Sequence, residues 1–332
     1  MAMKFEKIFI FLITLILLLT LTGCTGGVYR QPDQQYLVSG IAFKRDKSRI
    51  IAFAETVVVN TESTEQGVSR HVFSATGNTA EESLLNLSGK ISKPLLFDHC
   101  GLIAVDKDLS SEQFSQVIDY CKKNEEINLA AYMISSENTD TLFDCEPVST
   151  LTVSYDLLGV IDRVEFLNGI KFHNRYYEVC ANKLRESRCF FLPFVLVNKG
   201  EYILSGGDVY IDNKMVDSLG LTEGALYCLL TDNFSDGKFE DFEISDSKTR
   251  FECDLREDTL FITLNIKADL EKGDYAYLSD KIERTLENLR GNTDIFGFKD
   301  RISRKYRSLW NTVKDNYNFY YTNAKIEVKY EF

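Results

Sequence analysis

The chain has 332 residues, of which 44% are hydrophobic and 27% are charged, with only 4 prolines. This composition is that of an ordinary globular protein, and the length exceeds what one hydrophobic core usually holds, so two or three domains are expected. With 50 acidic and 38 basic residues the net charge is −12. That sign argues against nucleic acid as a partner, because its binding depends on Lys and Arg.

The first 24 residues have the pattern of an export signal. Lys4 and Lys7 precede an apolar run of fourteen residues, 8–21, which leads into Leu21-Thr22-Gly23-Cys24. Small residues directly before a cysteine indicate a lipobox, so residues 1–23 are interpreted as a signal peptide and Cys24 as the lipidated start of the mature protein. A transmembrane anchor is the alternative, but a spanning helix needs about 20 apolar residues.

A covalent lipid on Cys24 is the only non-protein group expected, and no cofactor is predicted. Diacylglycerol, with or without an N-acyl chain such as palmitate, gives stable anchoring because each buried CH2 contributes about 0.8 kcal/mol. Residues 24–35 then form a tether on the outer face of the cytoplasmic membrane. Removing residues 1–23 leaves 36 basic and 49 acidic residues, a net charge of −13, so electrostatic binding to anionic lipid is not expected.

The other cysteines number seven, which is odd, and they include no Cys-x-x-Cys pair. Several lie on apolar faces, as Cys121 does on its predicted helix. We interpret most of them as small buried hydrophobic residues with free thiols rather than as a disulfide framework. They are Cys100, Cys121, Cys145, Cys180, Cys189, Cys228 and Cys253.

The mature chain begins with predicted strands and then a helix. Two β-rich runs, 36–43 and 49–60, flank a charged turn and predict a hairpin. Thr79 and Glu82 have the spacing of a capping box, and the helix that they begin ends before Pro94.

A strand, a helix and a second strand come next. The strands are predicted at 101–105 and 129–134, and the helix between them starts at a second capping box, Ser110 and Gln113. Residues 149–186 have a mostly helical pattern. This order is typical of a mixed α/β domain.

The last part again mixes the two kinds of element. Strands are predicted at 189–197, 202–211 and 260–266, and a helix at 221–230. Residues 260–266 alternate apolar and polar side chains in the period-2 pattern of a half-buried strand. Two helices, 278–290 before Gly291 and 299–316, precede a closing strand at 324–332.

These elements predict an α+β fold with two to three mixed α/β domains along the chain. An N-terminal mixed α/β region, with one or two subdomains, is expected at 36–190, and a C-terminal α/β domain at 191–332. The sheets are expected to be mixed or antiparallel, with helices packed on them.

Several short motifs occur in a characteristic order. They are Phe73-Ser74-Ala75-Thr76-Gly77-Asn78-Thr79, Leu95-Leu96-Phe97-Asp98-His99-Cys100, Leu102-Ile103-Ala104-Val105, Phe191-Leu192-Pro193, Ser205-Gly206-Gly207-Asp208-Val209-Tyr210 and Asp294-Ile295-Phe296-Gly297-Phe298, followed by Trp310. This order resembles the spore germinant receptor C subunits, the Ger(x)C lipoproteins of the GerAC-like family, over nearly all of residues 36–332. Two segments differ from the family pattern: residues 25–31 lack a charged run, and residues 124–127 lack an arginine.

Gly297 stands between two large aromatic residues, Phe296 and Phe298, in the loop that joins two predicted helices. Either a positive φ or a close approach of backbone requires glycine at such a position. The two phenylalanines are expected to fill the core of the C-terminal domain.

The resemblance implies a non-enzymatic, lipid-anchored subunit of a spore germinant receptor, needed for nutrient-triggered germination. Its implied partners are two integral membrane subunits in the inner membrane of the spore. The alternative is a solute-binding lipoprotein of a membrane transporter, because two halves of the chain could form a ligand cleft. An exported enzyme is a third possibility.

The residues that could carry chemistry give little support for an enzyme. Asp98, His99 and Cys100 are sequence neighbours whose side chains point to alternating faces of extended chain, so we interpret His99 as a satisfied structural histidine. His71 and His173 lie in unrelated segments without zinc-site spacing. No catalytic, cofactor-binding or metal-binding residue is assigned.

Two further near-motifs are interpreted as ordinary turns. Residues 232–243 match an EF-hand loop at several positions, but Phe234 stands where a ligand oxygen is required. Gly206 and Gly207 lack the spacing of a phosphate-binding loop.

The lipobox generates the first prediction. Replacing Cys24 with Ala removes the thiol that is acylated, so the precursor should stay uncleaved and lack the mass of diacylglycerol. Mass spectrometry and detergent partitioning measure both effects. A processed, detergent-partitioning Cys24→Ala product would show that Cys24 is not the lipidation site.

Overall fold

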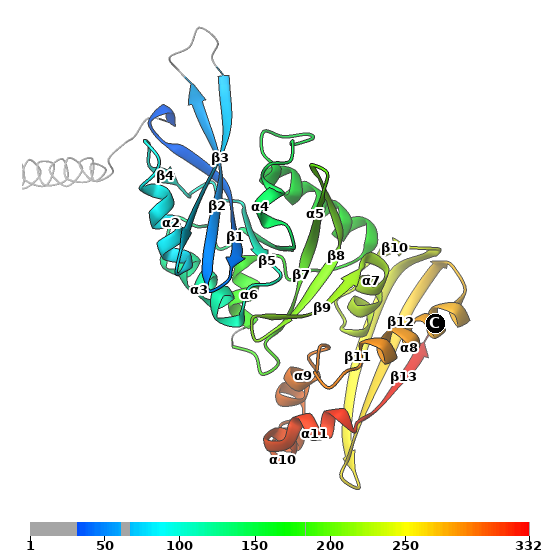
Figure 1. The fold of residues 1–332 in the computed structure, drawn as a ribbon. Coiled ribbons are helices and arrows are strands. Elements are labelled where there is room, and N and C mark those ends of the chain that lie inside the picture. The colour runs from blue at the N-terminus through cyan, green and yellow to red at the C-terminus, as the bar shows by residue number, and fades with distance from the viewer. Residues whose placement is uncertain (1–31, 61–66, 183, 332) are drawn as a thin grey trace, which may run out of the picture.

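A large mixed sheet forms the first part of the fold (Figure 1). The computed structural model describes residues 32–60, 67–182 and 184–331. The strand order is β3-β2-β1-β5-β6-β7-β8-β9, and β4 pairs with β1 beside this path. The strands are β1 Tyr36–Asp46, β2 Arg49–Asn60, β3 Gly67–Gly77, β4 Leu95–Leu96, β5 Leu102–Asp106, β6 Tyr132–Ser136, β7 Cys189–Asn198, β8 Glu201–Ile211 and β9 Lys214–Gly220.

Strand directions divide this sheet into three zones. β1, β2 and β3 are antiparallel, which confirms the predicted hairpin and adds a third strand that was not predicted. β1, β5, β6 and β7 are parallel neighbours, and β7, β8 and β9 are antiparallel again. The predicted α+β class with a mixed sheet is confirmed.

The domain boundary expected between residues 190 and 191 falls inside β7. Ser135 and Ser136 of β6 pair with Phe194 and Val195 of β7, so β7 belongs to the first sheet. The chain leaves this sheet only after β9. The expected boundary therefore has to be moved, because β7 pairs with the earlier strand β6 as well as with the later strand β8.

Helices cover both faces of the first sheet. One face carries α2 (Ala80–Ser88), α3 (Ser111–Lys123) and α6 (Tyr176–Asn182), and the other carries α4 (Thr139–Leu142), α5 (Val153–Asn168) and α7 (Leu221–Leu230). Each face packs into its own hydrophobic core, and β7 contributes to both. Phe190 and Leu192 lie on the first face, and Phe191 and Val195 lie on the second. Among the helices of the described ranges, none is long and apolar enough to cross a membrane.

The second sheet has the order β10-β11-β12-β13, with β13 parallel to β12 and the other pairs antiparallel. Its strands are β10 Gly237–Phe239, β11 Phe242–Arg256, β12 Thr259–Lys272 and β13 Lys325–Glu331. The alternation predicted for 260–266 is confirmed, since Leu260, Ile262, Leu264 and Ile266 are fully buried. α7 contacts strands of both sheets and α8 (Tyr275–Leu289), so the sheets share one core (Figure 1).

The prediction of one continuous helix at 299–316 is wrong. The chain instead forms α9 (Phe298–Lys305), α10 (Arg307–Val313), a 3-10 turn and α11 (Tyr317–Thr322). The break lies at Tyr306, with φ −125° and ψ 59°. The Tyr306 hydroxyl donates to the Phe251 carbonyl oxygen (3.2 Å), and the two rings meet edge to face, so a contact with the second sheet accompanies the break.

Of the two capping boxes predicted from the sequence, one forms completely and the other forms in part. Ser110 and Gln113 form the full reciprocal box. Thr79 accepts the Glu82 N–H (3.1 Å), whereas the Glu82 carboxylate accepts the backbone N–H of Asn78 (2.9 Å) instead of that of Thr79. α8 ends at Leu289, two residues before Gly291.

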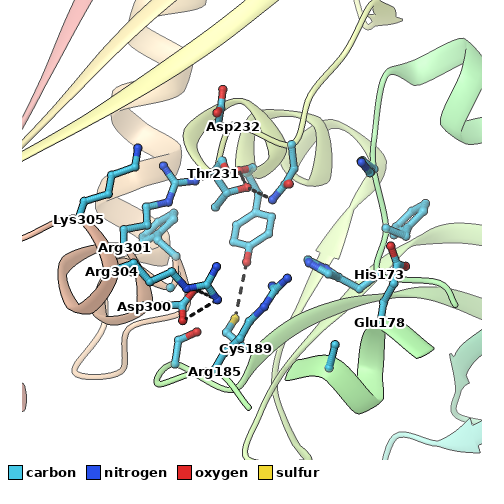
Figure 2. A pocket seen from close by; sticks show the side chains of 18 of the residues that line it. His173, Glu178, Arg185, Cys189, Thr231, Asp232, Asp300, Arg301, Arg304 and Lys305 are labelled. Carbon is cyan, nitrogen blue, oxygen red and sulfur yellow. Dashed lines mark hydrogen bonds and ion pairs between the residues drawn. The ribbon is translucent and has the colours of Figure 1, made fainter. Parts of the chain in front are cut away.

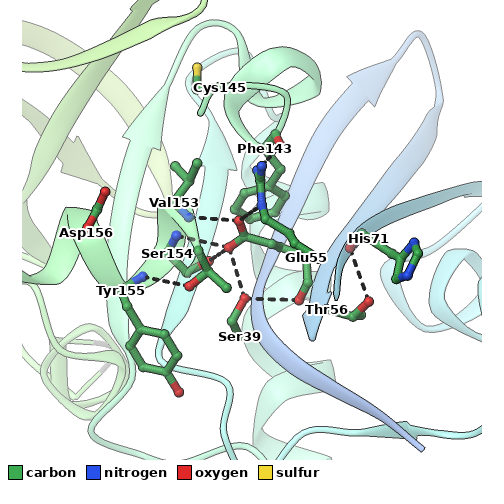
Figure 3. A network of polar contacts seen from close by, with 12 residues as sticks. Ser39, Glu55, Thr56, His71, Phe143, Cys145, Val153, Ser154, Tyr155 and Asp156 are labelled. Carbon is green, nitrogen blue, oxygen red and sulfur yellow. Dashed lines mark hydrogen bonds and ion pairs between the residues drawn. The ribbon is translucent and has the colours of Figure 1, made fainter. Parts of the chain in front are cut away.

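A buried carboxylate, Glu55 on β2, joins the strands to the start of α5 (Figure 3). It accepts the backbone N–H groups of Val153 (2.8 Å) and Ser154 (3.0 Å), the first two residues of α5. Negative charge is stabilised at a helix N-terminus by the unsatisfied N–H groups and the helix dipole. Ser39 on β1 also donates to the carboxylate (2.9 Å), and Arg70 on β3 pairs with it (2.6 Å).

The second prediction is that Glu55→Ala strongly destabilises the protein. The change leaves the α5 N–H groups without their acceptor and the Arg70 guanidinium without its ion-pair partner. The free energy of unfolding should therefore fall by about 3–5 kcal/mol, as it does when one partner of a buried pair is removed. Urea denaturation measures this loss. Glu252→Ala, at an exposed position of β11, is the control and should change stability by less than about 0.5 kcal/mol. Equal stability of the two variants would contradict the structural role of Glu55.

Candidate functional site

Cys24, the predicted lipidation site, lies outside the described residues. The neighbouring residues Asp98, His99 and Cys100 lie within them but do not converge. Asp98 and His99 are exposed, so His99 is not the satisfied structural histidine that was expected. Cys100 is buried and its thiol donates to the Leu102 carbonyl oxygen (3.5 Å). Burial raises the pKa of Cys100 to about 12, so the thiol is protonated at neutral pH and is a poor nucleophile.

The EF-hand-like segment forms a β-hairpin. The Asp232 carboxylate accepts the Thr249 N–H (2.7 Å), while Glu243 lies in β11 opposite Lys238 and pairs with it (2.7 Å). The acids are thus engaged in separate places rather than around one calcium position. In the described ranges, no group of three or more His, Cys, Asp or Glu side chains is placed to hold a metal ion.

The seven cysteines after Cys24 are free thiols, and five of them are buried. Burial raises the pKa of Cys189, Cys228 and Cys253 to about 12. These thiols therefore act as protonated, unreactive side chains. Cys189 has a further role, because it lies at the junction of the two sheets.

The loop 294–297 forms that junction. The Ile295 carbonyl oxygen accepts the Tyr227 hydroxyl (2.8 Å) from α7 and the Cys189 thiol (3.0 Å) from β7. The half-buried Asp294 carboxylate accepts the backbone N–H groups of Phe298 (3.1 Å) and Lys299 (2.7 Å), so it caps the start of α9. Burial raises the pKa of Asp294, and these donors offset part of the rise.

A row of stacked and tilted rings passes through the same junction. Ring centroids are 5.1 Å apart for Phe191 and Tyr227, 5.9 Å for Tyr227 and Phe296, and 5.3 Å for Phe296 and Phe298. Phe298 then meets Phe251 of the second sheet at 5.4 Å. The expectation that Phe296 and Phe298 fill the core is confirmed, since they are 3% and 0% exposed.

A cavity of about 490 Å³ opens beside this junction (Figure 2). One wall comes from residues 171–173, α6 and the side chains of Arg185, Ser187 and Cys189, and the opposite wall comes from α9. The end of α7 and residues 231–233 close it on a third side. Its walls therefore come from three parts of the chain that are distant in sequence, and the sequence analysis did not identify the cavity.

Basic side chains outnumber acidic ones around the cavity. Arg304 pairs with Asp300 (2.8 Å), and Arg301 donates to the Thr231 carbonyl oxygen. The excess is two positive charges, in a chain whose net charge is −12. The charged residues are Lys171, Arg185, Arg301, Arg304 and Lys305 against Glu178, Asp232 and Asp300.

His173 contributes a neutral ring to the same wall. Its Nδ1 atom accepts the Phe191 N–H (3.2 Å), so the ring proton of the neutral form lies on Nε2. Burial, together with the nearby Arg185 and Lys171, lowers the pKa of His173 to about 4. At neutral pH the ring is therefore an uncharged N–H donor.

Comparisons relate the chain to proteins of spore germination. The family described as Spore germination protein N-terminal domain matches residues 29–197, and the family described as Spore germination B3/GerAC like, C-terminal, matches residues 269–332. The spore germination protein GerQC of Bacillus cereus is 21% identical over 170 residues, covering 51% of this chain and 47% of that protein. The chain thus spans about half the length of this curated relative. The crystal structure of the GerBC protein has a similar fold, with a TM-score of 0.52 and 16% identity over 88% of this chain and 96% of that chain.

The third prediction concerns Gly297, which precedes α9 with φ +68°. Gly297→Val should lower the free energy of unfolding by about 1–2 kcal/mol, because a β-branched residue is strained in the left-handed region. An added Cβ would lie 3.5 Å from Ser187 Oγ, an ordinary contact, so the cost comes from the backbone. Gly297→Asn is the matched control, since Asn tolerates this conformation. Denaturation midpoints compare the two variants, and a Val variant as stable as the Asn variant would contradict the argument.

Proposed function

The chain belongs to the GerAC-like family of spore germination proteins, and on that premise we propose that it is the lipid-anchored, non-enzymatic C subunit of a germinant receptor. The observation that carries this proposal is the match of both family descriptions, in order, to residues 29–197 and 269–332. The similarity to the fold of GerBC supports the part of this proposal that concerns the fold.

Anchoring through Cys24 would keep the folded part close to the bilayer. The first described residue follows Cys24 by eight positions, and a tether of about ten residues spans at most roughly 35 Å. Such a tether raises the effective concentration of the folded part toward membrane partners. The proposed location is the outer face of the cytoplasmic membrane, which is the inner membrane of the spore, and the proposed partners are two integral membrane subunits.

A non-enzymatic role agrees with the chemistry of the candidate groups. Asp98 and His99 are exposed while Cys100 is buried, so the three do not act on one substrate atom. The best supported use of this chain is thus assembly with membrane subunits and participation in the response to small nutrients.

The fourth prediction tests this function in spores. Deleting the chain should block germination by one class of small nutrient, because the receptor lacks a subunit, while non-nutrient triggers still act. Loss of refractility and release of spore contents measure germination with each trigger. Expression of the wild-type chain should restore the response.

Two outcomes would contradict the proposal. One is normal germination of the deletion strain with every nutrient that triggers the parent strain. The other is a tagged chain that, isolated from spore membranes, carries no polytopic membrane protein with it.

A further inference from the structure

The cavity at the junction contains basic side chains without a partner in the part of the chain that the structure describes. Among the residues that the structure describes, the side chains of Lys171, Arg185 and Lys305 form no hydrogen bond or ion pair. Arg185 reaches between His173 and the basic side chains of α9 (Figure 2). Both walls of the cavity thus contribute positive charge, and the acidic residues that line the cavity neutralise only part of it.

The lining also offers apolar surface. Phe172 and Phe296 line the cavity and are almost fully buried, at 2% and 3% exposure, so they form firm walls. Sites for small molecules typically combine such walls with a few convergent polar groups and have volumes of about 300–1,000 Å³. A cavity of about 490 Å³ lies within this range.

We propose that this cavity binds a small dianion that carries carboxylate or phosphate groups. The planar guanidinium of Arg185 can hold two oxygens of such a group, the guanidinium of Arg304 on the α9 wall supplies a second charge, and the Nε2–H of His173 donates a hydrogen bond. Because its donors come from both walls, the dianion links the segment around Arg185 to α9. The site goes beyond the receptor assignment and does not depend on it.

The fifth prediction is measured by isothermal titration calorimetry on the full mature chain in detergent, at neutral pH and fixed ionic strength. The probes are inorganic phosphate and succinate, titrated separately. Saturable binding of phosphate alone identifies a phosphate-bearing ligand, and binding of succinate alone identifies a dicarboxylate. Binding of both supports recognition of dianions in general.

Variants distinguish the cavity from other surfaces. Arg185→Gln and Arg304→Gln should each weaken binding by about tenfold or more, since each removes a charge-assisted interaction. Arg163→Gln, at an exposed position of α5, is the control and should leave affinity unchanged. Melting temperatures should stay close to that of the wild type in all three. Arg185 has no side-chain partner within the described ranges, and an exposed i,i+4 ion pair such as Arg304–Asp300 contributes little to stability.

The proposal is overturned if neither probe binds saturably to the folded chain. It is also overturned if Arg185→Gln and Arg304→Gln bind as tightly as Arg163→Gln. These results concern the isolated chain, so they are separate from the germination phenotype that tests the receptor assignment.

Discussion

The backbone carbonyl oxygen of Ile295 fixes the loop 294–297 at the junction of the two sheets. It receives hydrogen bonds from Tyr227 of α7 and Cys189 of β7, both of which are buried. Buried hydrogen bonds are costly to break because no water replaces the lost partner. The adjoining Asp294 carboxylate caps α9, so the same loop places the basic wall of the cavity. The motif that relates the chain to its family thus also sets the geometry of the proposed anion site.

Features set by short-range physics could be predicted from the sequence. The capping box of Ser110 and Gln113 and the alternation at 260–266 depend on neighbours in the chain, and both occur as expected. A positive φ is one of the two reasons expected for the glycine at position 297, and the structure shows that conformation. The fold class followed from the order of these elements.

Features set by long-range contacts could not be predicted in the same way. The apolar pattern of 299–316 continues across Tyr306, but a hydrogen bond to Phe251 accompanies the break there. The pairing of β7 with β6 moves the domain boundary, and no local signal in β7 indicates it. The cavity is lined by Arg185 on one wall and by Arg304 of α9 on another. Residues this far apart in sequence form no motif that can be recognised in a single sequence.

The outer edge of the second sheet has a consequence for proteins held densely on a membrane. β13 pairs only with β12 among the described strands, so its other edge carries backbone groups that could pair with another chain. Its exposed positions alternate Lys325, Glu327, Lys329 and Glu331. Charged side chains, especially Lys, on an edge strand oppose the joining of sheets edge to edge. This strand would therefore be protected against aggregation if the proposed lipid anchor brings many copies together in two dimensions.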